Sequence, residues 1–230
     1  MNNLCLVLRL LLVILIVNIG FPGVAVAGGF CEPFRQSNVP QYVLNTMIDA
    51  ASAGHLYLFQ PEISQVGFSI DSTFMHVDGK FTKIEGGIAM ESGVEHKGQA
   101  LFAIRTDSVS TSNPLIDCII KSNTFLDVEN YPQILFISTG FKWLSNTTGH
   151  LKGKLTLHGV TKPVAFNVKL SDSVCKGVGK SDTVVAKIST SVNRTDFGMN
   201  EMKSAIGDTV VLSIRVHAKR SKLLCLQCHG

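Results

Sequence analysis

The carboxyl end of the chain carries two cysteines and a histidine in a potentially reactive arrangement. Two residues separate Cys225 from Cys228, and His229 follows directly. This C-x-x-C-H spacing is that of covalent c-type haem attachment, in which the thiols add to the vinyl groups and the imidazole binds the iron. Only Gly230 follows, so the rest of the chain would have to enclose the haem. The alternative is a C-terminal disulfide or dithiol, and the sequence leaves both open.

Haem attachment of this kind requires export, and the amino terminus predicts it. Residues 4–19 are almost wholly apolar and are followed by Gly20, Pro22 and the run Ala25-Val26-Ala27. A short apolar run that ends in a small-x-small site is typical of a secretory signal peptide, here residues 1–27. An uncleaved anchor is the alternative, although the run is short for a membrane span. We therefore expect a periplasmic or secreted protein.

Cleavage after Ala27 would leave an odd number of cysteines. An odd count in an oxidising compartment leaves at least one thiol outside an intramolecular disulfide. The pairing is not determined by the sequence. The cysteines that remain are Cys31, Cys118, Cys175, Cys225 and Cys228.

Other chemical functions find little support in the composition. The seven histidines are dispersed, and no pair has the spacing of a zinc site. No nucleophile, base and orienting residue stand together in a known catalytic motif. The net charge is +4 and Lys and Arg are scattered, which argues against a nucleic-acid partner. We expect a non-enzymatic protein with no metal site.

From Leu56 onward the apolar residues recur with a period of two, which predicts β-strands. Any binding site in this part of the chain would therefore be built on strands. In residues 151–157 leucines alternate with Lys152, Lys154 and Thr156, and residues 164–170 continue the alternation. One polar face and one apolar face are typical of antiparallel strands with one solvated side. About eight such strands close a barrel wide enough for one ligand. We therefore predict an all-β, eight-stranded antiparallel barrel, with a sandwich as the alternative.

Two segments have helical apolar spacing instead. Residues 43–53 predict a helix within an N-terminal preamble, residues 28–55, that packs on or caps the barrel. Residues 112–130 predict a short helical insertion that starts near Asn113 and Pro114 and could close one mouth. The predicted organisation is a signal peptide (1–27), the preamble, a barrel domain (56–219) and a tail (220–230).

Four motifs together resemble the YceI-like family. They are Asp127-Val-Glu-Asn-Tyr-Pro132, the hairpin Leu155-Thr-Leu-His-Gly-Val-Thr-Lys-Pro163, Asn193-Arg-Thr-Asp-Phe-Gly198, and the strand start Gly207-Asp-Thr-Val210. The Tyr-Pro element and the hairpin are specific as a pair. The resemblance covers residues 56–219 and implies a periplasmic or secreted lipocalin-like barrel that binds a polyisoprenoid or another long apolar amphiphile. The preamble and the tail lie outside it.

The alternating faces and the resemblance together give a predicted binding site. The predicted lipid-binding residues are Phe68, Ile70, Phe102, Ile104, Leu155, Leu157, Phe166, Val168, Leu212 and Ile214. Three basic residues near one mouth, Lys80, Lys83 and Arg194, are the predicted head-group contacts.

The leading hypothesis is therefore a non-enzymatic, exported carrier of an isoprenoid or fatty amphiphile. The carrier hypothesis is compatible with proximity to a membrane and with a homodimer. The alternative is an electron-transfer protein with a c-type haem on Cys225, Cys228 and His229 beside a quinone-like ligand.

Overall fold

The computed structural model describes residues 30–34, 37–90, 98–145, 147–171 and 182–221. Strands make up most of it. They are β1 (Leu56–Phe59), β2 (Gln65–Ser72), β3 (His76–Phe81), β4 (Ile84–Met90), β5 (Gly98–Arg105), β6 (Val109–Thr111), β7 (Gln133–Trp143), β8 (Thr148–Leu157), β9 (Val160–Leu170), β10 (Thr183–Asn193) and β11 (Ile206–Ser221). The helices are α2 (Gln41–Ser52) and α3 (Pro114–Lys121), with single 3-10 turns η1 (Glu32–Phe34), η2 (Thr106–Ser108) and η4 (Arg194–Phe197).

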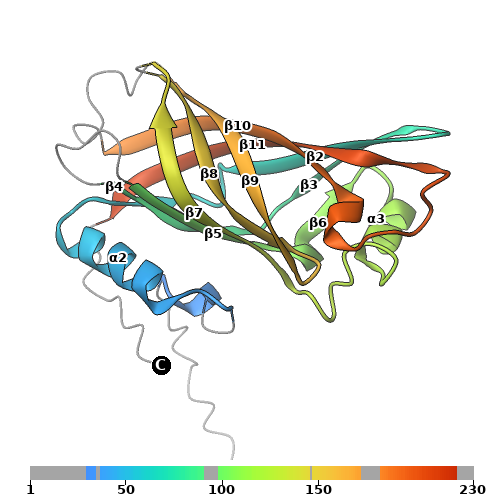
Figure 1. Ribbon diagram of the computed structural model, residues 1–230, viewed down its shortest axis with the longest axis horizontal. Helices are drawn as coiled ribbons and strands as arrows, with labels where there is room; N and C mark the ends of the chain where they lie inside the picture. The colour runs from blue at the N-terminus through green and yellow to red at the C-terminus, as the bar shows by residue number, and fades with distance from the viewer. Residues whose placement is uncertain (1–29, 35–36, 91–97, 146, 172–181, 222–230) are drawn as a thin grey trace, which may run out of the picture.

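The strands close into an antiparallel barrel. Eight of them form the ring β1-β4-β5-β7-β8-β9-β10-β11, and β11 closes it by pairing with β1. The strands β2, β3 and β6 extend the sheet from β11, so that β1–β2, β3–β4 and β5–β6 are each two parts of one bent strand. Figure 1 shows these extensions beside α3 at one end of the barrel. The predicted eight-stranded antiparallel barrel is confirmed.

The hairpin of β8 and β9 shows how the alternation sets the two faces. In β8 the residues Leu151, Leu155 and Leu157 are buried, whereas Lys152 and Lys154 between them are exposed. Inward apolar residues fill the barrel, and outward polar residues meet solvent, because successive side chains of a strand point to opposite faces. This is the predicted arrangement.

The turn of that hairpin is shorter than the stretch of turn-forming residues 158–163 would suggest. His158 and Gly159 alone connect the strands, with φ of 50° and 72°, and Val160 already pairs with Leu157. Two consecutive positive φ angles define a type I′ turn, whose twist matches that of the flanking strands. The ring of Tyr131 lies over the turn, 4.6 Å from the His158 ring. The two most specific sequence motifs are therefore in contact.

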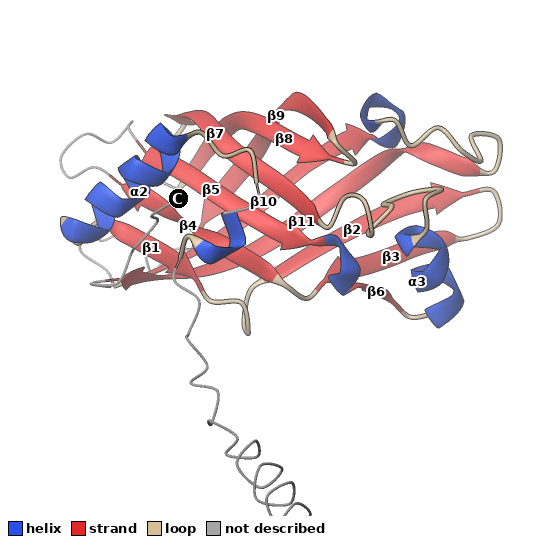
Figure 2. Ribbon diagram, turned by 90° about the horizontal axis from the view of Figure 1, so that it is seen from below, coloured by secondary structure: helices blue, strands red, loops and turns tan. Residues whose placement is uncertain are grey.

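The preamble helix covers the outside of the barrel at β1, β4, β5 and β7 (Figure 2). Its buried stripe, Val43, Leu44, Met47 and Ala51, packs against outward residues such as Leu101 and Leu135. This contact explains why residues 134–137 are apolar on both faces: one face lines the barrel and the other lies under α2. Nearby, Cys31 is disulfide-bonded, whereas Cys118 on α3 is an exposed free thiol.

The predicted insertion contains one helix of eight residues, and turns rather than helix follow Lys121. The Asn113 side chain accepts a hydrogen bond of 2.9 Å from the Leu115 N–H, and Pro114 occupies the first turn. This is the capping arrangement that satisfies one free N–H group at a helix start. Figures 1 and 2 place α3 at the end of the barrel opposite α2.

Candidate functional site

A cavity of about 430 Å³ occupies the end of the barrel near α3. Its walls come from β2, β3, β5, β7, β8, β9, β10 and β11, and α3 and the segments around η4 complete it. The lining is almost entirely apolar, with Ser72, Asn113 and Arg194 as its polar members. A volume of this size lies within the range of small-molecule pockets, and such a lining suits an apolar ligand.

Most of the predicted lipid-binding residues line this cavity. The members of the predicted set in its wall are Phe68, Ile70, Phe102, Ile104, Leu155, Leu157, Phe166, Leu212 and Ile214. The exception is Val168, which is buried in the interior but does not line the cavity. It pairs with Gly149 near the start of β8, in the half of the barrel that side chains fill.

An aromatic cluster forms the floor of the cavity: Phe102 and Phe166 line it, and Phe136 packs behind these two rings without lining it. The Phe136 ring is fully buried between Phe102, at 4.9 Å between ring centroids, and Phe166, at 5.1 Å. Below it lie buried residues that do not line the cavity: Leu151, Val168, Leu170, Val184, Ala186 and Val216. The interior is therefore divided into an open half and a packed half.

Exposed apolar side chains surround the mouth. Phe74 and Met75, in the turn between β2 and β3, are 86% and 52% exposed. Ile119 on α3 and Met202 after η4 are also exposed, and all four line the cavity. We call these four residues the apolar rim. Contiguous exposed apolar surface marks a contact site more often than scattered single residues do.

The sequence prediction missed this rim for an identifiable reason. The helical spacing of Leu115, Ile116, Ile119 and Ile120 indicated a helix but not where its apolar side would point, and α3 has no buried residue. Phe74 and Met75 lie in a hairpin turn, where periodicity gives no signal. Their location in an otherwise polar turn is the only sequence feature that could have singled them out.

Arg194 is the charged residue of the cavity lining and is 2% exposed. Its guanidinium lies over the Phe125 ring, 5.7 Å from the ring centroid. Four of its five N–H groups donate to the carbonyl oxygens of Met199 (2.6 Å), Glu201 (2.8 Å), Gly207 (3.0 Å) and Ile206 (3.1 Å). Arg194 therefore holds the segment between η4 and β11 closed around the mouth.

The charge of Arg194 has no carboxylate within ion-pair distance among the described residues. Asp208 is near enough to be influenced, and its pKa is lowered, first by the backbone N–H and hydroxyl of Thr195 and to a smaller extent by Arg194. A buried cation without an ion-pair partner is costly, so its carbonyl hydrogen bonds must offset the loss of water. An anionic group at the mouth would meet this positive charge.

The other two predicted head-group residues are not beside Arg194. Lys80 alternates with Gly79 and Phe81 along β3, so its side chain points outward and is exposed. Lys83 is exposed in the turn between β3 and β4. Neither residue lines the cavity, so the structure does not assemble the predicted three-residue cluster. The physical reason is the period-two alternation, which places Lys80 on the solvent side.

A second charged group lies at the tip of β2 and β3, beside Phe74. His76 Nδ1 contacts Asp71 Oδ1 at 2.5 Å, and His76 Nε2 lies 3.2 Å from Asp78 Oδ1. The hydrogen bond to Asp71, followed by the charge of Asp78, raises the pKa of His76 above 6.5. The imidazolium therefore persists to higher pH in the folded protein.

Several predicted features fall outside the described residues. These are the signal peptide (1–27) and the haem motif of Cys225, Cys228 and His229. In the described part of the chain, no group of three His, Cys, Asp or Glu side chains could hold a metal ion. None of the helices described is long and apolar enough to cross a membrane. The barrel itself extends slightly beyond the predicted boundary at 219, since Ser221 is buried and pairs with Leu56.

The comparison with family models decides the classification. The model of the YceI-like domain matches residues 57–218, which is the barrel. The chain belongs to the YceI-like family. The resemblance noted in the sequence is thus confirmed, and the YceI-like domain begins and ends with the closing strands β1 and β11.

Curated relatives agree with this assignment. A UPF0312 protein of Pseudomonas putida strain W619 is 32% identical over 166 residues, which is 70% of this chain and 80% of the relative. A UPF0312 protein of Pseudomonas syringae pv. tomato is 34% identical over 105 residues, 46% of this chain and 52% of the relative.

Solved structures show the same fold at lower identity. Burkholderia cenocepacia BcnA superposes with a TM-score of 0.62 at 18% identity, over 70% of this chain and 99% of that protein. A polyisoprenoid binding domain from Saccharophagus degradans, implicated in plant cell wall breakdown, superposes with a TM-score of 0.53 at 14% identity. It covers 71% of this chain and 98% of that domain. These likenesses establish the YceI-like barrel.

Proposed function

We propose that this YceI-like protein is an exported, non-enzymatic carrier that binds a long apolar amphiphile, such as a polyisoprenoid, in the cavity near α3. The observation that supports the proposal most directly is the nearly all-apolar lining of that cavity above its aromatic floor. Each methylene of a ligand transferred from water into it would contribute about 0.8 kcal/mol. Affinity would then come from chain burial, with few polar contacts.

The residues at the mouth of the cavity would orient such a ligand. Its tail would enter between the rim residues and end at the rings of Phe102 and Phe166, in front of Phe136, while its head group would stay near Arg194. An anionic head group suits the unpaired charge of Arg194 and the one N–H that its carbonyl contacts leave unused. Lys80 and Lys83 have no part in this arrangement, since both are exposed and outside the lining.

The apolar rim also suits transfer from a lipid surface. A water-insoluble chain leaves a bilayer most easily when the carrier's mouth contacts the bilayer, because the chain then avoids water. Phe74, Met75, Ile119 and Met202 provide that contact. We therefore propose proximity to a membrane, with the mouth facing it. A homodimer stays a prediction.

A pair of neighbouring residues provides the test. Leu212 lines the cavity, whereas Val211 beside it is exposed on the outside of the barrel. Leu212→Trp should fill the cavity and abolish binding of a fluorescent prenyl or fatty probe, and Val211→Trp should leave binding unchanged. Circular dichroism and thermal unfolding check that both variants fold. Equal binding by the two folded variants would refute the proposal.

Copurified lipid identifies the ligand. Native mass spectrometry of exported protein should show an added mass that extraction with organic solvent removes, and lipid analysis should then find a long apolar chain. A truncation after Ser221, which keeps all of β11, should retain that ligand. Loss of all ligand on truncation would point instead to the tail and to the haem alternative, which a Soret band would detect.

A further inference from the structure

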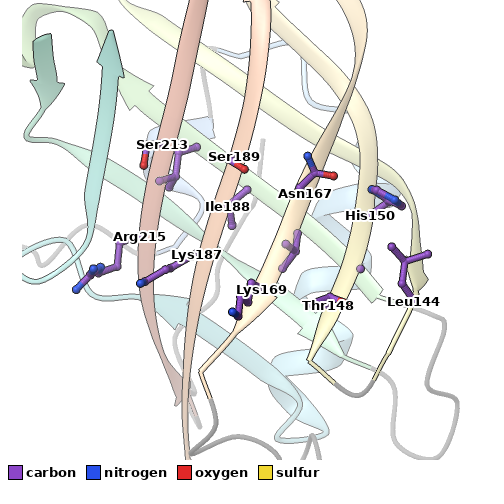
Figure 3. Close-up of a pocket in the computed structure, with 13 residues that line it drawn as sticks. Leu144, Thr148, His150, Asn167, Lys169, Lys187, Ile188, Ser189, Ser213 and Arg215 are labelled. Atoms are coloured by element: carbon purple, nitrogen blue, oxygen red, sulfur yellow. The ribbon is translucent and has the colours of Figure 1, made fainter.

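A second hollow lies on the outside of the barrel, over β8, β9, β10 and β11, and has a volume of about 500 Å³ (Figure 3). It shares the lining residue Ile214 with the interior cavity, but its charged and polar lining residues lie on the outward face of the sheet. Its edge includes Thr148 and His150 at the start of β8, whereas the residues of β8 that line the interior cavity, Leu155 and Leu157, lie at the end of that strand. The hollow therefore faces away from the barrel interior and lies farther from the mouth.

Strand register places three cations in one row across this hollow. Lys169 of β9 is directly opposite Lys187 of β10, and Lys187 is directly opposite Arg215 of β11. Figure 3 shows the three side chains following one another across the three strands. All three are exposed.

That row is electrostatically unfavourable in the free protein. Directly opposite residues on antiparallel strands have Cβ atoms about 4.5–5.5 Å apart, and like charges there are destabilising. Of the described strands under the hollow, β8, β9 and β10 contain no acidic residue, and Asp208 in β11 is bonded to Thr195. Among the described residues, none forms an ion pair with this row. An arrangement that costs stability without an internal partner suits an external anion.

The next outward row supplies neutral polar groups. His150 is opposite Asn167, Asn167 is opposite Ser189, and Ser189 is opposite Ser213. These four residues line the same hollow as the three cations. Rows of outward residues on a sheet are about 6.5–7 Å apart along the strands, since every second residue faces outward. The hollow thus presents cations along one side and hydroxyl, amide and imidazole groups along the other.

This pattern defines the chemistry of a ligand. Arg and Lys recognise phosphate, and Arg can do so with two parallel hydrogen bonds. Hydroxyl and amide groups one row away suit the hydroxyls of a sugar or polyol. The volume of about 500 Å³ is large enough for a small molecule. We propose that this hollow is a second binding site, for the phosphate ester of a sugar or polyol.

The test uses a pair of charge-matched variants of the whole protein. Lys187 is the middle cation of the row, and Lys152 on β8 is an exposed, outward lysine that does not line the hollow. Glucose 6-phosphate, titrated by isothermal calorimetry and by amide chemical shifts, should bind the native protein at millimolar concentration or below. Lys187→Gln should weaken that binding at least about tenfold, whereas Lys152→Gln should change it by less than about twofold.

Unliganded stability gives an independent readout. Lys187→Gln relieves two like-charge contacts, so its unfolding temperature should equal or exceed that of the native protein, and poor folding cannot then explain lost binding. The absence of binding by the native protein, or equal weakening by Lys187→Gln and Lys152→Gln, would overturn the site.

The phosphate ester could belong to a lipid head group or to a soluble molecule, and a vesicle-binding experiment distinguishes these two sources. Vesicles of phosphatidylcholine with phosphatidylglycerol present the ester as a lipid head group. Their binding, competed by glucose 6-phosphate and lost in Lys187→Gln but not in Lys152→Gln, would support the site with a lipid source. Binding of glucose 6-phosphate without vesicle binding would support it with a soluble source. None of these outcomes depends on the interior cavity, because Lys187 and Lys152 lie outside its lining.

Discussion

Phe136 stacks on Phe102 with their ring planes 22° apart, and this contact divides the barrel interior. On one side the wall residues leave a cavity, and on the other the side chains fill the space. The depth of the cavity therefore depends on a ring that is itself fully buried.

Removal of that ring should deepen the cavity. Phe136→Ala is expected to destabilise the fold by about 3–5 kcal/mol and to let a longer apolar chain bind. Phe141→Ala deletes the same ring in the packed half, where Phe141 contacts Trp143 at 4.6 Å. Binding of fatty acids of increasing length should shift toward longer chains only in Phe136→Ala. Equal chain-length preference in both variants would show that Phe136 is not the floor.

Gly153 leaves the space that the Phe136 ring occupies. A Cβ atom at Gly153 would collide with that ring and with the Ile137 carbonyl oxygen. Gly153→Ala should therefore destabilise the barrel by about 1–3 kcal/mol, the usual cost of overpacking. Gly140 on β7 is the control, because a Cβ there meets nothing within 4 Å. Urea unfolding should separate the two variants, and equal midpoints would contradict the packing argument.

Arg194 should matter to the mouth through its geometry as well as its charge. Arg194→Lys keeps the charge but cannot reach four carbonyl groups, so we expect a loss of about 1.5–3 kcal/mol or more in unfolding free energy. Lys80→Ala, on the solvent side of β3, should change stability by less than about 0.5 kcal/mol. An anionic amphiphile should bind less tightly to Arg194→Lys than to Lys80→Ala. The reverse order would assign head-group binding to the surface.

The hairpin tip should depend on pH through His76. Its pKa is raised by the Asp71 hydrogen bond and by the charge of Asp78. A raised folded pKa stabilises the hairpin fully below the ordinary value near 6.5 and less as the pH rises through the folded value. An NMR titration of the His76 ring should give a midpoint above 6.5, which Asp71→Asn should lower. An unchanged midpoint in Asp71→Asn would contradict the assigned cause.

The apolar rim should affect the rate at which lipid is loaded from a membrane rather than the free energy of unfolding. Phe74→Ser removes a side chain that is 86% exposed, so the unfolding free energy should change by less than about 0.5 kcal/mol. Loading of a prenyl probe from vesicles should nevertheless slow. Ile63→Ser is the matched control, since Ile63 is exposed between β1 and β2 and does not line the cavity. Equal loading rates in the two variants would argue against membrane contact by the rim.

The wall of the site was largely predictable, because the inward face of each strand follows from period-two alternation. Phe68, Phe102 and Leu212 could be assigned to the lining in this way. The failures share a cause. Val168 has the right face but lies past the aromatic floor. Lys80 was grouped with Arg194 because both are near strand ends, although they point to opposite sides of the sheet.

The amino-acid sequence was enough to predict antiparallel strands, their two faces, a helix start near Asn113 and the family. These depend on local spacing and on short motifs, which the chain contains within a few residues. Other features are visible only in the folded protein: the closure of the strands into a barrel rather than a sandwich, the half of the barrel that stays open, the direction of α3, and the row of Lys169, Lys187 and Arg215. Each of these depends on register between strands distant in sequence, and register is fixed by packing that no single segment specifies.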